Sequence, residues 1–280
     1  MIKLIADSSA DLYFPKEGAC FESVPMTIQA GERSFTDDKD LNVPEMLDYL
    51  AAYKGKSGTA CPGPERWMRA FEGADEIFVA TITSSLSGTY GSAMAARDLY
   101  LQEHPDVKIH VFDTMTTGPE MRLLLEKLAE LAAQGKSFDE LRCAGEAYLS
   151  STRLIYCLRS LHNLAQNGRV SQLAAGAVGL LGIRVLAVAS TEGTVEPVEK
   201  CRGDRKAQSS MIERMIAAGY RGGKVRISHV DDPAAALQLE LALHEQFPQA
   251  DIEFYPCLGL CSYYAERGGV LVGYEVEAEH

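Results

Sequence analysis

Short apolar runs alternate with amphipathic segments through the first half of the chain. Four runs, at residues 2–6, 24–30, 77–82 and 108–112, have the length and composition of strands. Helices are predicted at residues 42–53, 65–72, 93–101, 119–134 and 138–152. Because strands and helices alternate and polar loops follow the strands, the pattern predicts a parallel sheet between two layers of helices.

The pattern changes after residue 152. Six further strands are predicted at residues 154–158, 183–191, 195–200, 225–230, 252–255 and 270–276. Glu192-Gly193-Thr194 predicts a hairpin turn, and helices at 205–218 and 233–247 would cover one face of the sheet. We therefore predict an α/β chain of two domains. Residues 1–150 form a parallel-sheet, three-layer α/β/α domain, and residues 151–280 form an α+β domain with a largely antiparallel sheet.

Composition narrows the class of protein. With 46% hydrophobic and 24% charged residues in 280, the chain has ample material for a core. A net charge of -12 with scattered basic residues argues against a nucleic-acid partner. No apolar run reaches the roughly 18 residues that span a bilayer, so no stable membrane insertion is expected. The first residues predict a strand and not a signal peptide, so we expect a cytoplasmic protein, acting as a monomer.

The seven cysteines do not predict a metal site. Cys257 and Cys261 form one closely spaced pair, but the sequence offers no second pair and no histidine beside them. A zinc site needs four such ligands. We therefore expect reduced thiols and no bound metal.

Residues 81–93 carry the strongest candidate chemistry. This segment, T-I-T-S-S-L-S-G-T-Y-G-S-A, leads from a predicted strand into a predicted helix. Hydroxyls, together with the backbone N–H groups of Gly88 and Thr89 at the start of the helix, suit an anionic oxygen group. Neither the lysine of a phosphate-binding loop nor a G-x-G-x-x-G run is present, so a carboxylate fits better than a phosphate. The alternative is that Ser87 only caps the helix.

Three further polar clusters follow strands, begin helices or lie in predicted loops. They are Asp7-Ser8-Ser9, Thr59-Ala60-Cys61-Pro62 and Asn167-Gly168-Arg169-Val170-Ser171. A parallel sheet would bring the first two to the same edge as residues 81–93, which predicts a hydroxyl-lined pocket. Ordinary turn and cap chemistry is the alternative for each cluster taken alone.

A hydroxyl nucleophile is a second hypothesis. Ser85 or Ser87 would then serve a small serine hydrolase acting on acyl or ester substrates. Such a serine needs a base within hydrogen-bonding reach, and the G-x-S-x-G pattern is absent here. Among the histidines only His229, at a predicted strand end, is placed like a functional residue. A small-molecule sensor with a shorter or more polar pocket is a third hypothesis.

Several motifs occur in a fixed order along the chain. They are D-S-S-A-D-L at residues 7–12, V-P-M at 24–26, T-x-x-P at 59–62, S-S-L-S-G-T-Y-x-S-A at 84–93 and G-R-x-S at 168–171. In this order they resemble the motifs of the DegV family of bacterial fatty-acid-binding proteins. The resemblance extends over essentially the whole chain.

The resemblance implies a two-domain α/β fold with a buried acyl tunnel between the domains. Thr59 and Ser87 match the residues that hydrogen-bond the fatty-acid carboxylate in the family, with Gly88 and Thr89 beside them. It also implies a non-catalytic role, with a long-chain fatty acid as ligand and no cofactor. Several family members are binding subunits that present the fatty acid to a separate, ATP-dependent fatty-acid kinase subunit. Additional pocket candidates are Ser8, Ser85, Arg169 and Tyr264.

The chain departs from the family pattern in three places. Tyr264 stands where many members have a histidine near the C-terminus. The family's Gly-Gly-Arg motif reads Asn167-Gly168-Arg169. A basic cluster that the family uses to dock the kinase is interrupted by Asp204. Its docking candidates here are Arg202, Arg205 and Lys206, after Lys200.

Acyl burial would dominate the affinity of such a site. Each buried methylene contributes roughly 0.8 kcal/mol, whereas each head-group hydrogen bond contributes about 1 to 3 kcal/mol. We therefore expect the hydroxyls to orient the ligand and the acyl chain to set its affinity.

Overall fold

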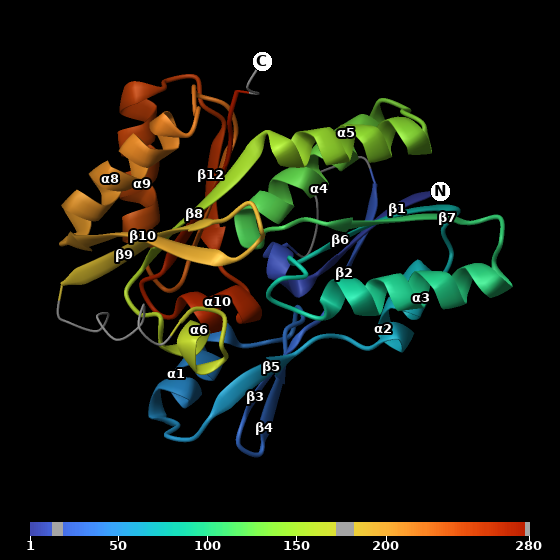
Figure 1. Cartoon of the computed structure of the whole chain (residues 1–280), viewed down its shortest axis with the longest axis horizontal. Helices are drawn as coiled ribbons and strands as arrows, with labels where there is room; N and C mark the ends of the chain where they lie inside the picture. Colours follow the sequence, from blue (N-terminus) through green and yellow to red (C-terminus); the bar gives the residue numbers. More distant parts are fainter. Residues whose placement is uncertain (13–18, 172–181, 278–280) are drawn as a thin grey trace.

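Two sheets, each with helices packed against it, dominate the computed structural model, which describes residues 1–12, 19–171 and 182–277 (Figure 1). Sheet A has the order β2-β1-β6-β7, and every neighbouring pair is parallel. Its strands are β1 (Ile2–Asp7), β2 (Cys20–Val24), β6 (Glu76–Thr81) and β7 (Lys108–Asp113). The parallel sheet that the first half predicts is confirmed.

Helices cover both faces of sheet A. On one face lie α2 (Pro64–Phe71) and α3 (Thr89–Glu103), and on the other lie α4 (Gly118–Ala133) and α5 (Phe138–Ser150) (Figure 1). Separate apolar clusters fill the two interfaces, one around Trp67 and Val79 and one around Phe78 and Leu124. The predicted three-layer α/β/α arrangement around a parallel sheet is thus confirmed.

Sheet C has six strands in the order β10-β9-β8-β13-β11-β12. These are β8 (Thr152–Leu158), β9 (Ile183–Ala189), β10 (Val195–Arg202), β11 (Val225–His229), β12 (Ile252–Pro256) and β13 (Val270–Glu275). Only the β11–β12 pair is parallel, so the prediction of a largely antiparallel sheet is confirmed. Helices α8 (Asp204–Ala217) and α9 (Pro233–Gln246) pack on one face (Figure 1).

A third, small sheet was not predicted. Sheet B has the order β4-β3-β5, from β3 (Thr27–Ala30), β4 (Arg33–Thr36) and β5 (Ser57–Ala60). The single strand predicted at residues 24–30 is therefore wrong. The chain leaves sheet A after Val24 and enters sheet B at Thr27, with Pro25, which has no N–H to donate to a ladder, between them. The Met26 N–H instead donates to Ser8 Oγ at 3.1 Å.

Short helices complete the fold. They are the 3-10 turn η1 (Ser8–Ala10), α1 (Val43–Ala52), α6 (His162–Gln166) and α10 (Gly259–Ala265). Side chains cap two of the helices, since Asn42 Oδ1 accepts from the Glu45 N–H at 3.2 Å and Ser137 forms a capping box with Glu140. In the described part of the chain, no helix has the length and apolar character needed to cross a membrane.

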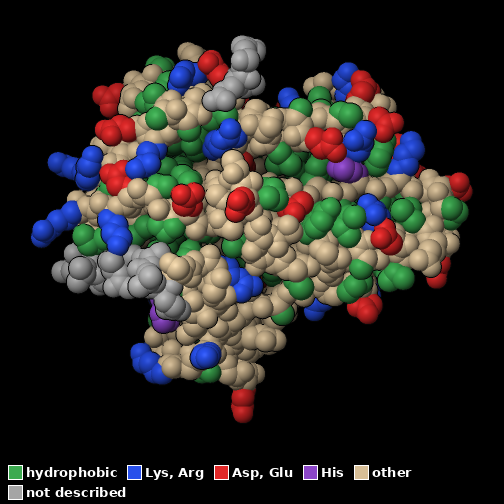
Figure 2. All heavy atoms as spheres, in the orientation of Figure 1, with side chains coloured by type: hydrophobic (Ala, Val, Ile, Leu, Met, Phe, Trp, Pro, Cys, Tyr) green, Lys and Arg blue, Asp and Glu red, His purple; other side chains and the backbone are tan. Residues whose placement is uncertain are grey.

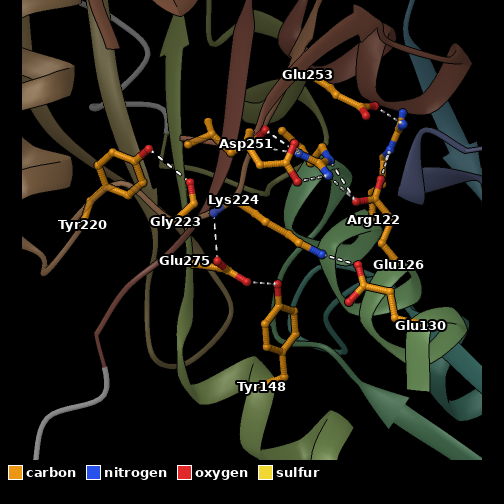
Figure 3. A network of polar contacts seen from close by, with 12 residues as sticks. Arg122, Glu126, Glu130, Tyr148, Tyr220, Gly223, Lys224, Asp251, Glu253 and Glu275 are labelled. Atoms are coloured by element: carbon orange, nitrogen blue, oxygen red, sulfur yellow. Dashed lines mark hydrogen bonds and ion pairs between the residues drawn. The ribbon is translucent and has the colours of Figure 1, made fainter. Parts of the chain in front are cut away.

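Helix α4 touches both main sheets. It contacts β1 and β6 of sheet A and β8, β11 and β13 of sheet C. On its flank, Glu126 accepts hydrogen bonds from Arg122 and Arg226, both at 2.8 Å, and Arg226 also pairs with Asp251 at 3.2 Å (Figure 3). Because one helix packs against both sheets, the boundary between domains at residues 150 and 151 stays a prediction.

Candidate ligand-binding pocket

A pocket lies where the carboxyl edge of sheet A meets β5, sheet C and α10. Its wall is largely apolar. Among the lining residues are Met26, Ile82, Leu158, Leu164, Val195 and Leu271. Strands β8, β10 and β13 supply part of this wall, so both halves of the chain form the pocket.

Thr59 meets Tyr264 at the pocket. Because side chains alternate along a strand, Ser57 and Thr59 share one face of β5. Two consecutive tyrosines of α10 face them. The hydroxyls of Thr59 and Tyr264 lie 2.8 Å apart, and those of Ser57 and Tyr263 also lie 2.8 Å apart. Tyr264 thus brings its hydroxyl to the side chain of Thr59 at the pocket.

Ser87 lies beside Arg169. The Arg169 Nε–H donates to the Leu86 carbonyl at 3.0 Å, and all three residues line the pocket. The Ser92 hydroxyl donates to the Pro62 carbonyl at 2.7 Å, which ties α3 to the T-x-x-P segment. This contact draws together the two motifs that contain Thr59 and Ser87.

Helix capping does not account for Ser87. The N-cap of α3 is Gly88, and no side chain caps the helix. The Ser87 hydroxyl lies 2.7 Å from Thr89 Oγ1 and 3.4 Å from the Thr89 N–H. Only the first of these is a short hydrogen bond, so Ser87 presents its hydroxyl to the pocket beside α3.

Four of the eight candidate pocket residues line the pocket, namely Thr59, Ser87, Arg169 and Tyr264. The other four have different surroundings. Gly88 is exposed, and Thr89 is buried with its hydroxyl on Met26 Sδ at 3.4 Å. Ser8 is buried against the Met26 N–H, and Ser85 donates to the Glu192 carbonyl at 2.5 Å. The carboxylate-binding roles of all these residues stay predictions.

The serine-hydrolase hypothesis requires a base beside a hydroxyl. Among the described residues, Ser87 pairs with Thr89 and Ser85 with a backbone carbonyl, and neither is hydrogen-bonded to a histidine or carboxylate. His229 contacts the Asp232 N–H at 3.3 Å. The condition set for that hypothesis is not met within the part of the chain that is described.

Three buried aspartates hold the pocket walls. Asp7 accepts from the Ile82 N–H at 2.7 Å, Asp11 from the Leu258 N–H at 2.8 Å, and Asp37 from two N–H groups of α10. Burial raises the pKa of Asp7 and Asp37 to about 6 and that of Asp11 to about 7, against hydrogen bonds that lower it.

The local sequence does not indicate a role for Asp37. Asp-Asp-Lys-Asp at residues 37–40 has the composition of an exposed charged turn, and only the fold buries the first aspartate completely. Within the described residues, no group of three or more His, Cys, Asp or Glu side chains is arranged to hold a metal ion.

The predicted docking cations lie on the surface at the β10–α8 junction. Arg202, Arg205 and Lys206 are exposed, in the region where basic side chains project beside α8 (Figure 2). Asp204, which interrupts the cluster in sequence, forms an ion pair with Arg184 at 2.7 Å. The negative charge of Asp204 is thereby paired with an arginine of β9.

This architecture and this pocket define an α/β protein with an internal, mostly apolar ligand site. The chain belongs to the DegV family, because the family model described as "Uncharacterised protein, DegV family" matches residues 1–275. A DegV domain-containing protein of Streptococcus pneumoniae is 44% identical over 278 residues, covering 98% of this chain and 99% of that protein.

Solved structures agree closely with this fold. A DegV family protein from Eubacterium eligens loaded with heptadecanoic acid has a TM-score of 0.97 and 47% identity, covering 99% of this chain and 100% of that one. The S. pneumoniae fatty acid kinase (Fak) B3 protein loaded with linoleic acid has a TM-score of 0.96 and 44% identity, covering 99% of each chain. The family resemblance drawn from the motifs is confirmed.

Proposed function

We propose that this chain binds a long-chain fatty acid, with the carboxylate at Thr59 and Ser87 and the acyl chain along the apolar wall. The observation that carries the proposal is a mostly apolar pocket in which Thr59, Ser87, Arg169 and Tyr264 supply hydrogen-bond donors. Hydroxyls and a guanidinium hold a carboxylate well. The two similar proteins crystallised with heptadecanoic and linoleic acid support the choice of ligand.

Mass spectrometry of small molecules extracted from the folded protein tests this proposal. Recovery of C16 to C18 acids in stoichiometric amount is the expected result. A protein that is purified empty and also refuses added fatty acid would contradict it. Binding restricted to short or polar acids would favour the sensor hypothesis instead.

Removing the head-group hydroxyls provides the first variant test. We expect the double variant Thr59→Ala, Ser87→Ala to lose about 2 kcal/mol or more of binding free energy, about thirtyfold in Kd. The acyl wall is untouched, so weak binding should persist and the melting temperature should change little. Unchanged affinity by titration calorimetry would place the carboxylate elsewhere.

We further propose that the bound acid is presented to a separate kinase subunit for acyl-phosphate formation, with no catalytic residue supplied by this chain. The name of the S. pneumoniae relative and the exposed Arg202, Arg205 and Lys206 support this step. Loaded protein, a bacterial fatty-acid kinase catalytic subunit and ATP should yield acyl-phosphate, trapped by hydroxylamine as the hydroxamate.

Charge reversal separates docking from binding. Changing Arg202, Arg205 and Lys206 to Glu should abolish turnover without altering fatty-acid affinity, because none of them lines the pocket. Lys39→Glu is the control, because Lys39 is exposed and lies far in sequence from the predicted docking cations; this variant should keep full turnover. Full turnover by the triple variant would contradict the docking surface.

A further inference from the structure

Helix α10 forms one wall of the pocket, yet its first turn is held by residues from the other end of the chain. Its N-cap residue, Leu258, has no polar side chain to offer. Asp37 accepts from both the Gly259 N–H at 2.6 Å and the Leu260 N–H at 2.8 Å, one with each carboxylate oxygen. Asp37 has no exposed surface, so these charge-assisted bonds are shielded from water.

The same small sheet also carries Thr59. Asp37 directly follows β4, β4 pairs with β3, and β3 pairs with β5 with Ile28 opposite Thr59. The Asp37 N–H donates to the Met26 carbonyl at 2.9 Å, which fixes Asp37 relative to another pocket residue. Sheet B and the residue that follows β4 therefore contact α10 at both ends. Asp37 holds its first turn, and Ser57 and Thr59 meet Tyr263 and Tyr264 near its last turn.

The contact at the first turn leaves little freedom for movement. A Cβ added to Gly259 would lie 2.5 Å from Asp37 Oδ1 and 2.6 Å from Leu41 Cδ2. Residues 259 and 264 are separated by little more than one helical turn, so displacement at one end is carried to the other. Hydrogen bonds to a carboxylate tolerate such displacement far less than apolar contacts do.

We propose that Asp37 is a positioning residue of the head-group site, fixing α10 so that the Tyr264 hydroxyl stays aligned with Thr59. This inference rests on the proposed function, because the affected ligand group is the fatty-acid carboxylate. Both carboxylate oxygens of Asp37 accept a backbone N–H. In an asparagine, the side-chain NH2 group would face one of these N–H donors and could not accept its hydrogen bond.

Comparing an acid with the matching alcohol tests the proposal. Binding of dodecanoic acid and 1-dodecanol is measured by calorimetry on the whole chain, with the parent and Asp37→Asn. We expect the Kd for the acid to rise at least tenfold and the Kd for the alcohol to rise less than threefold. Damage to the tunnel or fold in general would weaken both ligands equally, and that result, or no change for either, would overturn the proposal.

Glu120→Gln is the matched control. Glu120 is also a buried carboxylate, but its oxygens accept from the hydroxyls of Thr116 and Thr152 and not from α10. The Glu120→Gln variant should leave the ratio of acid to alcohol affinity unchanged. An equal change of that ratio in Glu120→Gln and Asp37→Asn would assign the effect to lost buried charge and overturn the role of Asp37.

Two further variants keep the test decisive. If Asp37→Asn does not fold, Gly259→Ala displaces α10 while retaining the aspartate, and it should show the same acid-selective loss. In a Tyr264→Phe background, Asp37→Asn should add little, because both changes act on one contact. Full additivity would overturn the proposal. Failure of the parent itself to bind either ligand would instead contradict the proposed function.

Discussion

At the scale of single residues, the carboxyl group of Asp11 is buried but hydrogen-bonded through one of its two oxygens. Its Oδ1 accepts from the Leu258 N–H, whereas its Oδ2 has no hydrogen-bond partner in the described part of the chain. Burial raises the pKa of Asp11 to about 7, so the group is ionised at pH 8 in surroundings that disfavour its charge.

We expect Asp11→Asn to stabilise the protein at pH 8 by about 1 to 3 kcal/mol, because the amide keeps the Oδ1 acceptor and removes the buried charge. The folded pKa of Asp11 lies above its ordinary value of 3.8. The contribution of protonated Asp11 to the free energy of unfolding is therefore complete below pH 3.8 and is lost as the pH rises through about 7. The advantage of the variant should shrink on acidification and vanish near pH 3.8. Urea denaturation across this range checks it, and a pH-independent difference would refute it.

At the scale of elements, the turn between β9 and β10 packs against the loop that contains Ser87. Gly193 in this turn has a φ of +74°, and a Cβ there would collide with the Thr83 side chain. The Ser85 hydroxyl also donates to the Glu192 carbonyl at 2.5 Å. The sequence predicted the hairpin from its turn residues, but its contact with sheet A depends on the tertiary fold.

Gly193→Ala should therefore both destabilise the protein and speed release of the fatty acid, because Val195 of the same hairpin lines the pocket. Gly73→Ala is the control, since Gly73 has a nearly identical φ of +76° with nothing within 4 Å of an added Cβ. Both variants bear the cost of about 1 to 2 kcal/mol for a left-handed non-glycine residue. Only Gly193→Ala should exceed it. Equal melting temperatures and equal release rates would rule out tight docking of the hairpin.

At the scale of the whole molecule, α4 packs on sheet A through apolar contacts and is tied to sheet C by a partly buried ion network. Glu126 is 11% exposed and accepts from Arg122 and Arg226, which are 12% and 5% exposed (Figure 3). The guanidinium of Arg122 also lies 4.0 Å from the ring centroid of Tyr255 on β12. Removing the shared carboxylate would leave two guanidinium groups without their common partner.

Glu126→Gln should thus lower the free energy of unfolding by about 1.5 to 3 kcal/mol, because Arg122 keeps Glu253 and Arg226 keeps Asp251 as partners. Lys136→Gln, which breaks a solvent-exposed pair with Glu140, should leave the free energy of unfolding almost unchanged. Fluorescence of Trp67, buried beside sheet A, and far-UV circular dichroism should shift together in urea because α4 packs on both sheets. A loss as small as that of the control would mean that the network does not hold α4 to sheet C.

Most of the helices and strands, the two kinds of main sheet and the family could be predicted from the sequence alone, which also singled out Thr59 and Ser87 as candidates. Each of these is encoded by periodicity or by residues close together in the chain. Sheet B and α10 were missed because their strands and helix are short and carry little periodic signal.

The residues that surround the motif hydroxyls, in contrast, are brought there by long-range packing. Thr59 meets Tyr264 across 205 positions, and Asp37 meets Gly259 across 222. Contacts at such separations depend on how the layers pack and on which charges that packing removes from water. The local pattern of Asp-Asp-Lys-Asp contains neither, so the first aspartate of a sequence typical of an exposed turn is a buried support of the pocket.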